Sequence, residues 1–504
     1  MNRNFENYST QIVLFISLLI SFPLLFENAL EHSFPLGYAG LFTQMAQQIS
    51  DANLRLPMDS PFYGPSGIPF AYPPFGLYLL AILIKLTGKY FIFLRLLPPL
   101  LSLLALIPLF YLTLELSGSS IAAAITVILA ATSPDLYIAH TWAAGIVRAP
   151  AFLFALTSLY FFTRQLKSRS RTDIILTGVS LGLAFLSHLV YGLFCVLWIG
   201  WWTLFSKNHA LLARFKDSIS SVTIAILTTS IWLITIMSRY GIEILFNAFD
   251  SHGGAALLSF WQNIQRLPGA FLTNIEPITS NSLLFILVGI GVIVLLVKRD
   301  YGMVLFYLFI VLAFPEGERF IFLLGCIIAG VGLFALIAWV STISDGRLKP
   351  TVFALILIPI LGILWWNGFK ALSRYSPLIS NETFDVAEHV QASTLPNETY
   401  LALVRQDEAE WMPFLFQRKP LVSQWGSEWL GAYNEQTYLM SRFGGCRVSE
   451  DWSCVESVIR ETANGPDYVV TYVNDEKLNQ QLIETSQWTQ VYTNRRYTLW
   501  SRNN

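Results

Sequence analysis

Residues that could do chemistry are few in this chain, and most of them lie where long apolar runs end. They are acids, histidines and two arginines: Glu27, Glu31, His32, Asp51, Asp59, Asp135, His140, Arg148, His188, Glu243, Asp250, His252, Glu276, Glu316, Glu318 and Arg319. Two or three acids that converge from separate loops can act as a general base or as ligands of a cation. Guanidinium groups bind phosphate through paired hydrogen bonds, so Arg148 and Arg319 are candidates for a phosphate site.

Each of these residues also has a structural interpretation. Asp135 follows Ser133-Pro134, where side chains often cap a helix or close a turn. Arg148 and Arg319 stand beside apolar runs, and long basic side chains can extend from such positions to the water interface. His188, in LSHLVYGLF, is typical of a histidine packed at an interface. The sequence alone leaves both interpretations open.

The composition defines the class of protein in which these residues must act. Of 504 residues, 54% are hydrophobic and only 13% are charged, whereas an average soluble protein is about 25% charged. So little charge could not cover a soluble core of this size. The net charge of −1 offers no basic surface for nucleic acid. The composition therefore predicts a polytopic membrane protein.

The apolar runs lie before about residue 370 and predict about eleven membrane-spanning helices. They occupy residues 11–26, 95–116, 121–134, 149–162, 174–187, 189–206, 219–237, 283–297, 301–314, 320–340 and 351–366. A further run, 72–88, starts with Tyr72-Pro73-Pro74 and carries Lys85 near its centre. These features favour an interfacial or re-entrant helix over a further span.

Basic clusters indicate the orientation of the spans. They lie at 164–171, 207–216, 298–299 and 347–349, and two spans separate each cluster from the next. All four therefore lie on one side, which the positive-inside rule makes the cytoplasm. This predicts a multi-pass protein of the plasma (inner) membrane. Its amino terminus is cytoplasmic, its first loop (27–94) is long and external, and its carboxy-terminal part is extracytoplasmic.

Two domains are expected, a transmembrane domain over 1–370 and a small extracytoplasmic α/β domain over 371–504. The second part is charged and contains four predicted strands, at 399–404, 467–473, 490–494 and 497–502. Cys446 and Cys454 lie eight residues apart, with no His or other Cys nearby for a zinc site. A disulfide in an oxidising compartment is the preferred interpretation, and two unpaired surface thiols are the alternative.

Aromatic residues are concentrated in one short part of this second domain, namely Trp411, Trp425, Trp429 and Tyr433. Aromatic faces stack on sugar rings, so the cluster could contact a glycan. The core of a small domain or a belt that faces the membrane gives the same pattern. Core packing is the default interpretation.

The layout and several segments resemble the GT-C superfamily of polyprenyl-phosphate-dependent glycosyltransferases, which includes protein O-mannosyltransferases and aminoarabinose transferases. The segments are GYAGLFTQMAQQISDANLRLP (37–57), FAYPPFGLYLLAIL (70–83), FLRLLPPLLSLLALIPLFYLTLELSG (93–118) and TSPDLYIAHTWAAGIVRAP (132–150). The family usually carries an essential acid just before its first interfacial helix. This chain has Gly37-Tyr38-Ala39 there, and the nearest acid is Glu31.

The resemblance implies an inverting transfer of a sugar from a polyprenyl-phosphate donor to an external glycan, lipid or protein. Glu31, supported by Asp135 or His140, is expected to act as the base, and Arg148 or Arg319 to stabilise the departing phosphate. Whether a divalent cation (Mg²⁺ or Mn²⁺) is needed stays open, with Glu31 and Asp135 as its candidate ligands.

A second hypothesis is a non-catalytic scaffold that binds a lipid-linked glycan or a partner enzyme, which the missing family acid favours. A transporter is the weaker third hypothesis. Transporters place ionisable groups near the membrane midplane, whereas those of this chain cluster at the ends of its apolar runs.

Overall fold

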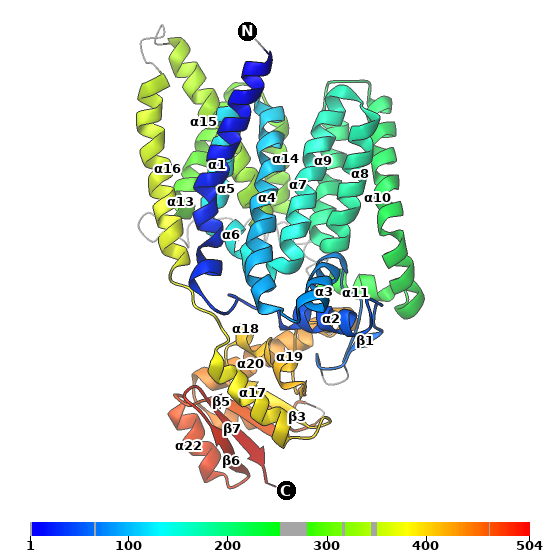
Figure 1. Ribbon diagram of the computed structural model, residues 1–504, viewed down its shortest axis with the longest axis vertical. Coiled ribbons are helices and arrows are strands. Elements are labelled where there is room, and N and C mark those ends of the chain that lie inside the picture. Colours follow the sequence, from blue (N-terminus) through cyan, green and yellow to red (C-terminus); the bar gives the residue numbers. More distant parts are fainter. Residues whose placement is uncertain are drawn as a thin grey trace.

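The computed structural model describes residues 3–64, 67–251, 280–314, 318–343, 350–462 and 464–503. These residues form a bundle of long helices and, at one end of it, a smaller domain that contains a β-sheet (Figure 1). The amino terminus lies at the far end of the bundle and the carboxy terminus at the tip of the small domain. Three short helices lie where the two parts meet.

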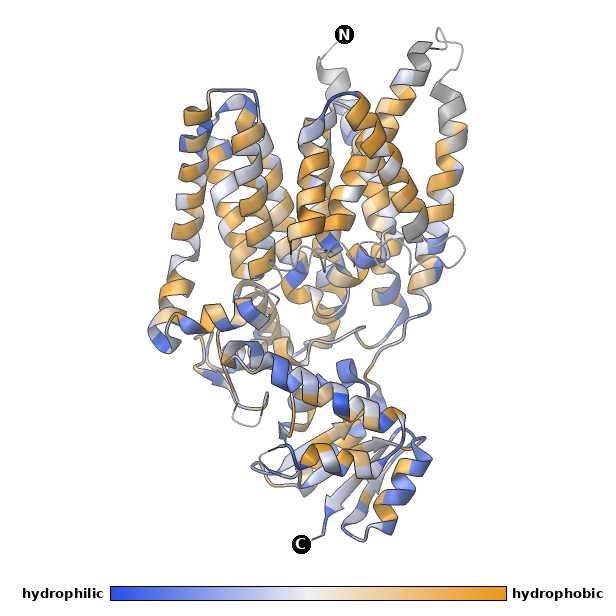
Figure 2. Cartoon of the chain, turned by 180° about the vertical axis from the view of Figure 1, so that it is seen from behind, coloured by the Kyte–Doolittle hydropathy of each residue, from blue (hydrophilic) through white to orange (hydrophobic). Residues whose placement is uncertain are grey.

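The apolar runs form the helices of the bundle. These are α1 (Arg3–Glu31), α4 (Phe91–Ser117), α5 (Ser120–Thr132), α6 (Pro134–Thr141), α7 (Gly145–Ser168), α8 (Arg171–Ser187), α9 (Leu189–Phe205), α10 (Leu211–Tyr240), α13 (Ser280–Val297), α14 (Tyr301–Ala313), α15 (Glu318–Ile343) and α16 (Pro350–Leu372). Figure 2 shows hydrophobic residues along the length of these helices and a more hydrophilic small domain. Outward-facing residues of the bundle, such as Ile231 and Ile234, are apolar and exposed. Helices with apolar outer surfaces suit a lipid environment.

Five helices in the described part of the chain are long and apolar enough to cross a membrane: α1 from Tyr8, α4, α7, α10 and most of α15. Helices α5 and α6 make a sixth if this pair, bent by 69° at its break, is one span. Several others, including α9, α13 and α14, are apolar but shorter. These helices have the length and composition of membrane spans, while the count of about eleven spans stays a prediction.

Helices α2 (Gly40–Asp51), α3 (Phe75–Thr87) and α11 (Glu243–Ser251) lie at the end of the bundle next to the small domain (Figure 1). At 13 residues, α3 is shorter than the roughly 20 that a span requires. It packs on α2 and on the start of α7. Strands β1 (Asp59–Ser60) and β2 (Ile68–Pro69) form a small antiparallel pair in the same loop.

The small domain is built on a five-stranded sheet of order β4-β3-β5-β7-β6. Its strands are β3 (Thr399–Leu403), β4 (Lys419–Pro420), β5 (Tyr468–Tyr472), β6 (Trp488–Thr493) and β7 (Tyr497–Arg502). Strands β4, β3 and β5 run parallel, and β7 and β6 are antiparallel to their neighbours. The four strands expected from the sequence are present, and the short β4 is an addition.

Helices cover both faces of the sheet. They are α17 (Asn381–Ser393), α18 (Gln406–Ala409), α19 (Met412–Phe416), η2 (Ser427–Leu430), α20 (Tyr433–Val448), α21 (Trp452–Ile459) and α22 (Glu476–Glu484). Tyr400 packs with α17 and α19 on one face, while the next residue, Leu401, packs with α20, α21 and α22 on the other. A disulfide joins Cys446 in α20 to Cys454 in α21, with their Cα atoms 5.4 Å apart.

Buried polar contacts fasten the small domain to the first loop. The Glu410 carboxylate accepts hydrogen bonds of 2.7 Å from the backbone amides of Gly40 and Leu41, which open α2. The Trp411 indole donates to the Gly37 carbonyl at 2.9 Å. A Cβ on Gly40 would stand 2.5 Å from the Glu410 carbonyl oxygen, so only glycine permits this approach. These contacts fix the position of the domain over the bundle.

Candidate active site

A cavity of about 470 Å³ lies between the bundle and the small domain. Its walls come from the first loop, from the bundle ends of α7, α8, α9, α14 and α15, from α11, and from the small domain. The lining residues are Tyr38, Leu41, Phe42, Tyr72, Pro73, Arg148, Phe185, His188, Leu189, Val190, Leu193, Leu245, Ala248, Phe249, Phe314, Arg319, Asp407, Gln424, Trp425, Glu428, Trp429 and Tyr433. The cavity exists because the domain is docked, since neither part encloses it alone.

The two arginines predicted to bind phosphate line this same cavity. Arg148 lies in the first turn of α7. Gly76 of α3 packs closely against this turn, because a Cβ added to Gly76 would lie 2.4 Å from the Ile146 carbonyl oxygen. Arg319 stands at the start of α15, with its guanidinium carbon 5.6 Å from the centre of the Tyr191 ring. Helix starts from two distant parts of the chain thus bring two guanidinium groups to one cavity.

Arg148 is held in place by Tyr38, which belongs to the Gly37-Tyr38-Ala39 segment where the resemblance leads one to expect an acid. Its Nη2 donates to the Tyr38 hydroxyl, and the guanidinium carbon lies 5.5 Å from the centre of that ring. Its Nε is buried without a hydrogen-bond partner among the described residues. A neutral phenol positions the guanidinium without adding a negative charge of its own, which favours an anionic ligand.

The acidic side of the cavity comes from the small domain. Asp407 in α18 and Glu428 in η2 both line it. Asp407 is exposed at the rim, but the surrounding protein removes part of its hydration, which raises the pKa of the carboxyl above its usual value, while Arg148 opposes this effect. A carboxylate with a raised pKa is a stronger base, as a general base requires.

Neither of these acids was among the candidates taken from the sequence. They belong to a segment with the ordinary charge of a soluble domain, where an acid is most often a solvated surface group. The signal nearest to them is the aromatic cluster.

That aromatic cluster divides between the cavity and the core. Trp425, Trp429 and Tyr433 line the cavity, whereas Trp411 is fully buried and bonded to the first loop. The Tyr72 ring lies 6.0 Å from that of Trp429. Both interpretations of the cluster therefore apply, each to different residues. Three aromatic rings beside two carboxylates give a surface suited to a sugar.

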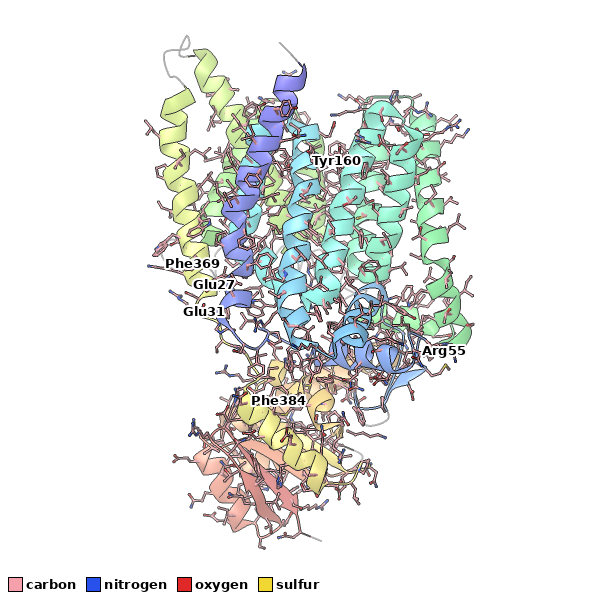
Figure 3. The ribbon with its side chains drawn as sticks, viewed as in Figure 1. Glu27, Glu31, Arg55, Tyr160, Phe369 and Phe384 are labelled. Carbon is pink, nitrogen blue, oxygen red and sulfur yellow. A yellow bond between two sulfur atoms is a disulfide. The ribbon has the colours of Figure 1, made fainter. Side chains whose placement is uncertain are left out.

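The residues predicted to act as the base lie elsewhere. Figure 3 shows Glu27 and Glu31 at the end of α1 beside α16, and Glu31 is exposed. Asp135 opens α6. None of Glu31, Asp135 and His140 is among the described residues that line the cavity. His252, Glu276 and Glu316 lie outside the described residues.

His140 supports the cavity from behind. It is 2% exposed, its Nδ1 contacts the Leu136 carbonyl, and its Nε2 lies 2.6 Å from the Tyr191 hydroxyl. Because the Tyr191 ring also faces Arg319, His140 helps to hold the surface against which that guanidinium lies. His188, also predicted as an interfacial residue, lines the cavity itself.

A divalent cation would need several suitable ligand side chains close together. Within the described ranges, no three His, Cys, Asp or Glu side chains are grouped so that they could hold a metal ion. Mg²⁺ and Mn²⁺ sites in proteins need several oxygen ligands in a defined geometry. The described residues form no such site.

In fold, the chain is similar to solved structures of an oligosaccharyltransferase and of ArnT. Residues 71–234 match the family model described as Dolichyl-phosphate-mannose-protein mannosyltransferase. No protein of curated function matches the chain in sequence. The resemblance to the superfamily is confirmed by this match and by solved structures that share the fold.

Two solved structures illustrate the likeness. The apo oligosaccharyltransferase of Archaeoglobus fulgidus aligns with 93% of this chain and 70% of its own, at 16% identity and a TM-score of 0.60. ArnT from Cupriavidus metallidurans bound to undecaprenyl phosphate aligns with 97% of both chains, at 13% identity and a TM-score of 0.53. At these identities the likeness establishes the fold and assigns no residue a role.

Proposed function

We propose that this chain transfers a sugar from a polyprenyl-phosphate carrier to an acceptor on the outer face of the membrane, with inversion at the anomeric carbon. The observation that carries the proposal is the convergence of Arg148 and Arg319 in one cavity, to which the small domain adds two carboxylates and three aromatic rings. ArnT, which shares the fold, has been solved with undecaprenyl phosphate. The donor class is taken from that likeness and from the cavity's chemistry.

The two arginines stabilise the leaving group. As the bond between the anomeric carbon and the phosphate oxygen breaks, its electron pair passes to the lipid phosphate, and negative charge grows on that group. Guanidinium groups already in position stabilise this charge without reorganising. Arg148 is held by Tyr38, and Arg319 lies against Tyr191, so both are oriented before the donor binds.

The cavity also has an apolar part that suits the lipid chain. Phe185, Leu189 and Leu193 line it from α8 and α9, and Leu245 and Phe249 from α11. An isoprenoid placed there would leave water at a gain of about 25 cal/mol per Å² of apolar surface. The phosphate would then lie between the apolar part and the polar small domain, at the level of the arginines.

Asp407 is the preferred general base, because it lines the cavity from the side opposite the bundle. It would take the proton of an acceptor hydroxyl, whose oxygen attacks the anomeric carbon from the face opposite the phosphate. Glu428 would support it. Glu31 and Asp135 stay as alternative bases, and His140 as a residue that positions Tyr191.

The experiment is a transfer assay with a radiolabelled polyprenyl-phosphate sugar and the purified protein in proteoliposomes. Arg148→Gln should weaken donor binding about 10- to 100-fold, since a charged hydrogen bond contributes about 1.5–3 kcal/mol. Arg374→Gln, an exposed arginine that does not line the cavity, is the matched control. Unchanged donor affinity in Arg148→Gln would contradict the proposal.

A non-catalytic scaffold is the second candidate, and one observation favours it. Tyr38 replaces the acid expected before α2, and it pairs with Arg148. A scaffold would bind the donor through the same arginines without turnover. If the wild-type protein binds the lipid-linked sugar and neither transfers nor hydrolyses it with any acceptor offered, the scaffold is correct and Asp407 has no catalytic role.

A further inference from the structure

The small domain contains a second cavity, of about 270 Å³, at the carboxyl end of β3. Residues that follow β3, residues of and just after β4, and one side of α20 enclose it. Among them are Val404, Arg405, Ser423, Phe443 and Arg447.

The topology explains why a cavity forms at this point. Strands β3 and β4 are parallel neighbours. The chain leaves β3 for α19, on the face of Tyr400, and leaves β4 for α20, on the opposite face of Leu401. Where two adjacent parallel strands send their helices to opposite faces, a crevice opens beyond the strand ends, and α/β proteins bind ligands there.

The lining of this second cavity is largely apolar, with two arginines and three aromatic residues, Tyr400, Trp425 and Phe443. Arg405 and Arg447 contribute to it, and none of its described lining residues is an Asp or a Glu. Arg447 forms an ion pair of 3.7 Å with Asp475 through Nη1, and its guanidinium carbon lies 5.5 Å from the centre of the Tyr472 ring. Its Nε is buried with no hydrogen-bond partner in the described part of the chain. Guanidinium donors beside an indole ring suit a negatively charged, hydroxylated molecule.

The second cavity adjoins the candidate active site. Trp425 lines both cavities. Two short segments, 406–407 and 423–424, separate the two cavities. In each segment one residue lines one cavity and the next residue lines the other. Gln406 and Ser423 face the second cavity, and Asp407 and Gln424 face the active-site cavity. A hydrogen bond of 2.6 Å from Gln406 to Gln424 joins the two segments.

We infer that the cavity at the carboxyl ends of β3 and β4 binds the acceptor through an anionic sugar or sugar phosphate. An acceptor held there would extend past Trp425, so that its reactive hydroxyl reaches Asp407. The role as acceptor site rests on the proposed transferase function. The binding of an anionic sugar does not, because it follows from the lining of the cavity.

The chain offers a matched pair of variants. Gly444 in α20 lines the second cavity, and a Cβ added to it meets nothing within 4 Å. Gly445, the next residue, has equal space and is not among the residues that line either cavity. Gly444→Leu therefore fills the cavity, while Gly445→Leu makes the same change of residue on the same helix without filling it.

The test measures binding of D-glucuronate, glucose 6-phosphate and uncharged glucose to the full chain in detergent, by calorimetry. At least one anionic sugar should bind more tightly than glucose, by tenfold or more. Gly444→Leu and Arg447→Gln should weaken it at least tenfold, and Gly445→Leu should leave it unchanged. Circular dichroism and donor-lipid binding should stay as in the wild type.

The inference is overturned if none of the sugars binds, or if Gly444→Leu binds them as the wild type does. A separate outcome concerns the function alone. If the anionic sugar binds, Gly444→Leu blocks it, and no sugar transfer occurs under any condition, the binding site stands and the proposed transferase function fails.

Discussion

Arg148 and Asp407 have different roles in the proposed reaction: the arginine binds the donor phosphate and the acid deprotonates the acceptor. The arginine comes from the bundle and the acid from the small domain, and both line one cavity. Of the two, Arg148 could be recognised from its place beside an apolar run. Asp407 could not, because its function depends on a tertiary contact with residues more than 200 positions away in the chain.

Asp407→Asn should lower kcat by about 10²- to 10⁴-fold, the usual contribution of a general base, and leave donor affinity unchanged. The pKa of Asp407 is raised, so wild-type kcat/KM should climb with pH and level off above that pKa. In Asp407→Asn, the rise of kcat/KM with pH should disappear. Steady-state transfer rates from pH 4 to pH 8 check both expectations.

Glu31→Gln and Asp135→Asn are the comparison variants for Asp407→Asn. Neither residue is among the described residues lining the cavity, so both variants should keep near wild-type rates. If one of them abolishes turnover while Asp407→Asn does not, the base lies in the first or second loop, as the sequence alone suggested. Full activity in both would exclude the roles predicted for Glu31 and Asp135.

At the scale of elements, the contact between the small domain and α2 decides whether the cavity exists. Glu410 accepts hydrogen bonds from the first amides of α2, in the manner of a capping side chain supplied from another domain. Glu410→Ala should destabilise the docked state by about 1–2 kcal/mol. Hydrogen exchange of the Gly40 and Leu41 amides should accelerate accordingly, while unchanged protection would show that other contacts hold the domain.

The docking contact should also depend on pH. Burial raises the pKa of Glu410 to about 7 from its usual 4.5, against the lowering effect of the α2 amides. A group with a raised pKa stabilises the folded form below its unfolded value and loses that contribution as pH rises through the folded value. Docking should therefore weaken between about pH 4.5 and pH 7 and stay constant above.

Glu410→Gln is the control for this pH effect. The amide oxygen still accepts a hydrogen bond from α2 but does not titrate, so the variant should lose the pH dependence and keep most of the docking. Thermal unfolding of the wild type and of Glu410→Gln, measured from pH 4 to pH 9, compares how the stability of the two proteins depends on pH. Neighbouring Asp407 is present in both proteins, and burial raises the pKa of Tyr63 and of Tyr400 above the usual value of 10, so neither tyrosine titrates in this range.

The elements themselves were largely predictable, because they follow from local patterns. Apolar runs gave the bundle helices, and alternation gave the strands from 399 onward. The short run at 72–88 became α3 at the end of the bundle, since its prolines and Lys85 mark it as unsuited to the membrane interior. The contact between Glu410 and α2 spans 370 positions, and no local pattern reveals such a pairing.

At the scale of the whole molecule, the active-site cavity needs both parts of the chain. The bundle supplies the arginines and an apolar wall, and the small domain supplies the two acids and three aromatic residues, Trp425, Trp429 and Tyr433. The alternative location is the end of α1, where Glu27 and Glu31 lie beside α16 (Figure 3). The two locations are formed by different elements, so a probe carried on the phosphate can distinguish them.

The most direct test is photo-crosslinking with a polyprenyl phosphate that carries a photoactivatable group beside the phosphate. Cross-linked peptides are then identified by mass spectrometry. Labels should fall on the residues around Arg148 and Arg319, with Tyr38, Tyr72 and Trp429 among them, and Arg148→Gln should reduce the yield. Labelling confined to the end of α1 around Glu27 and Glu31 would contradict the account.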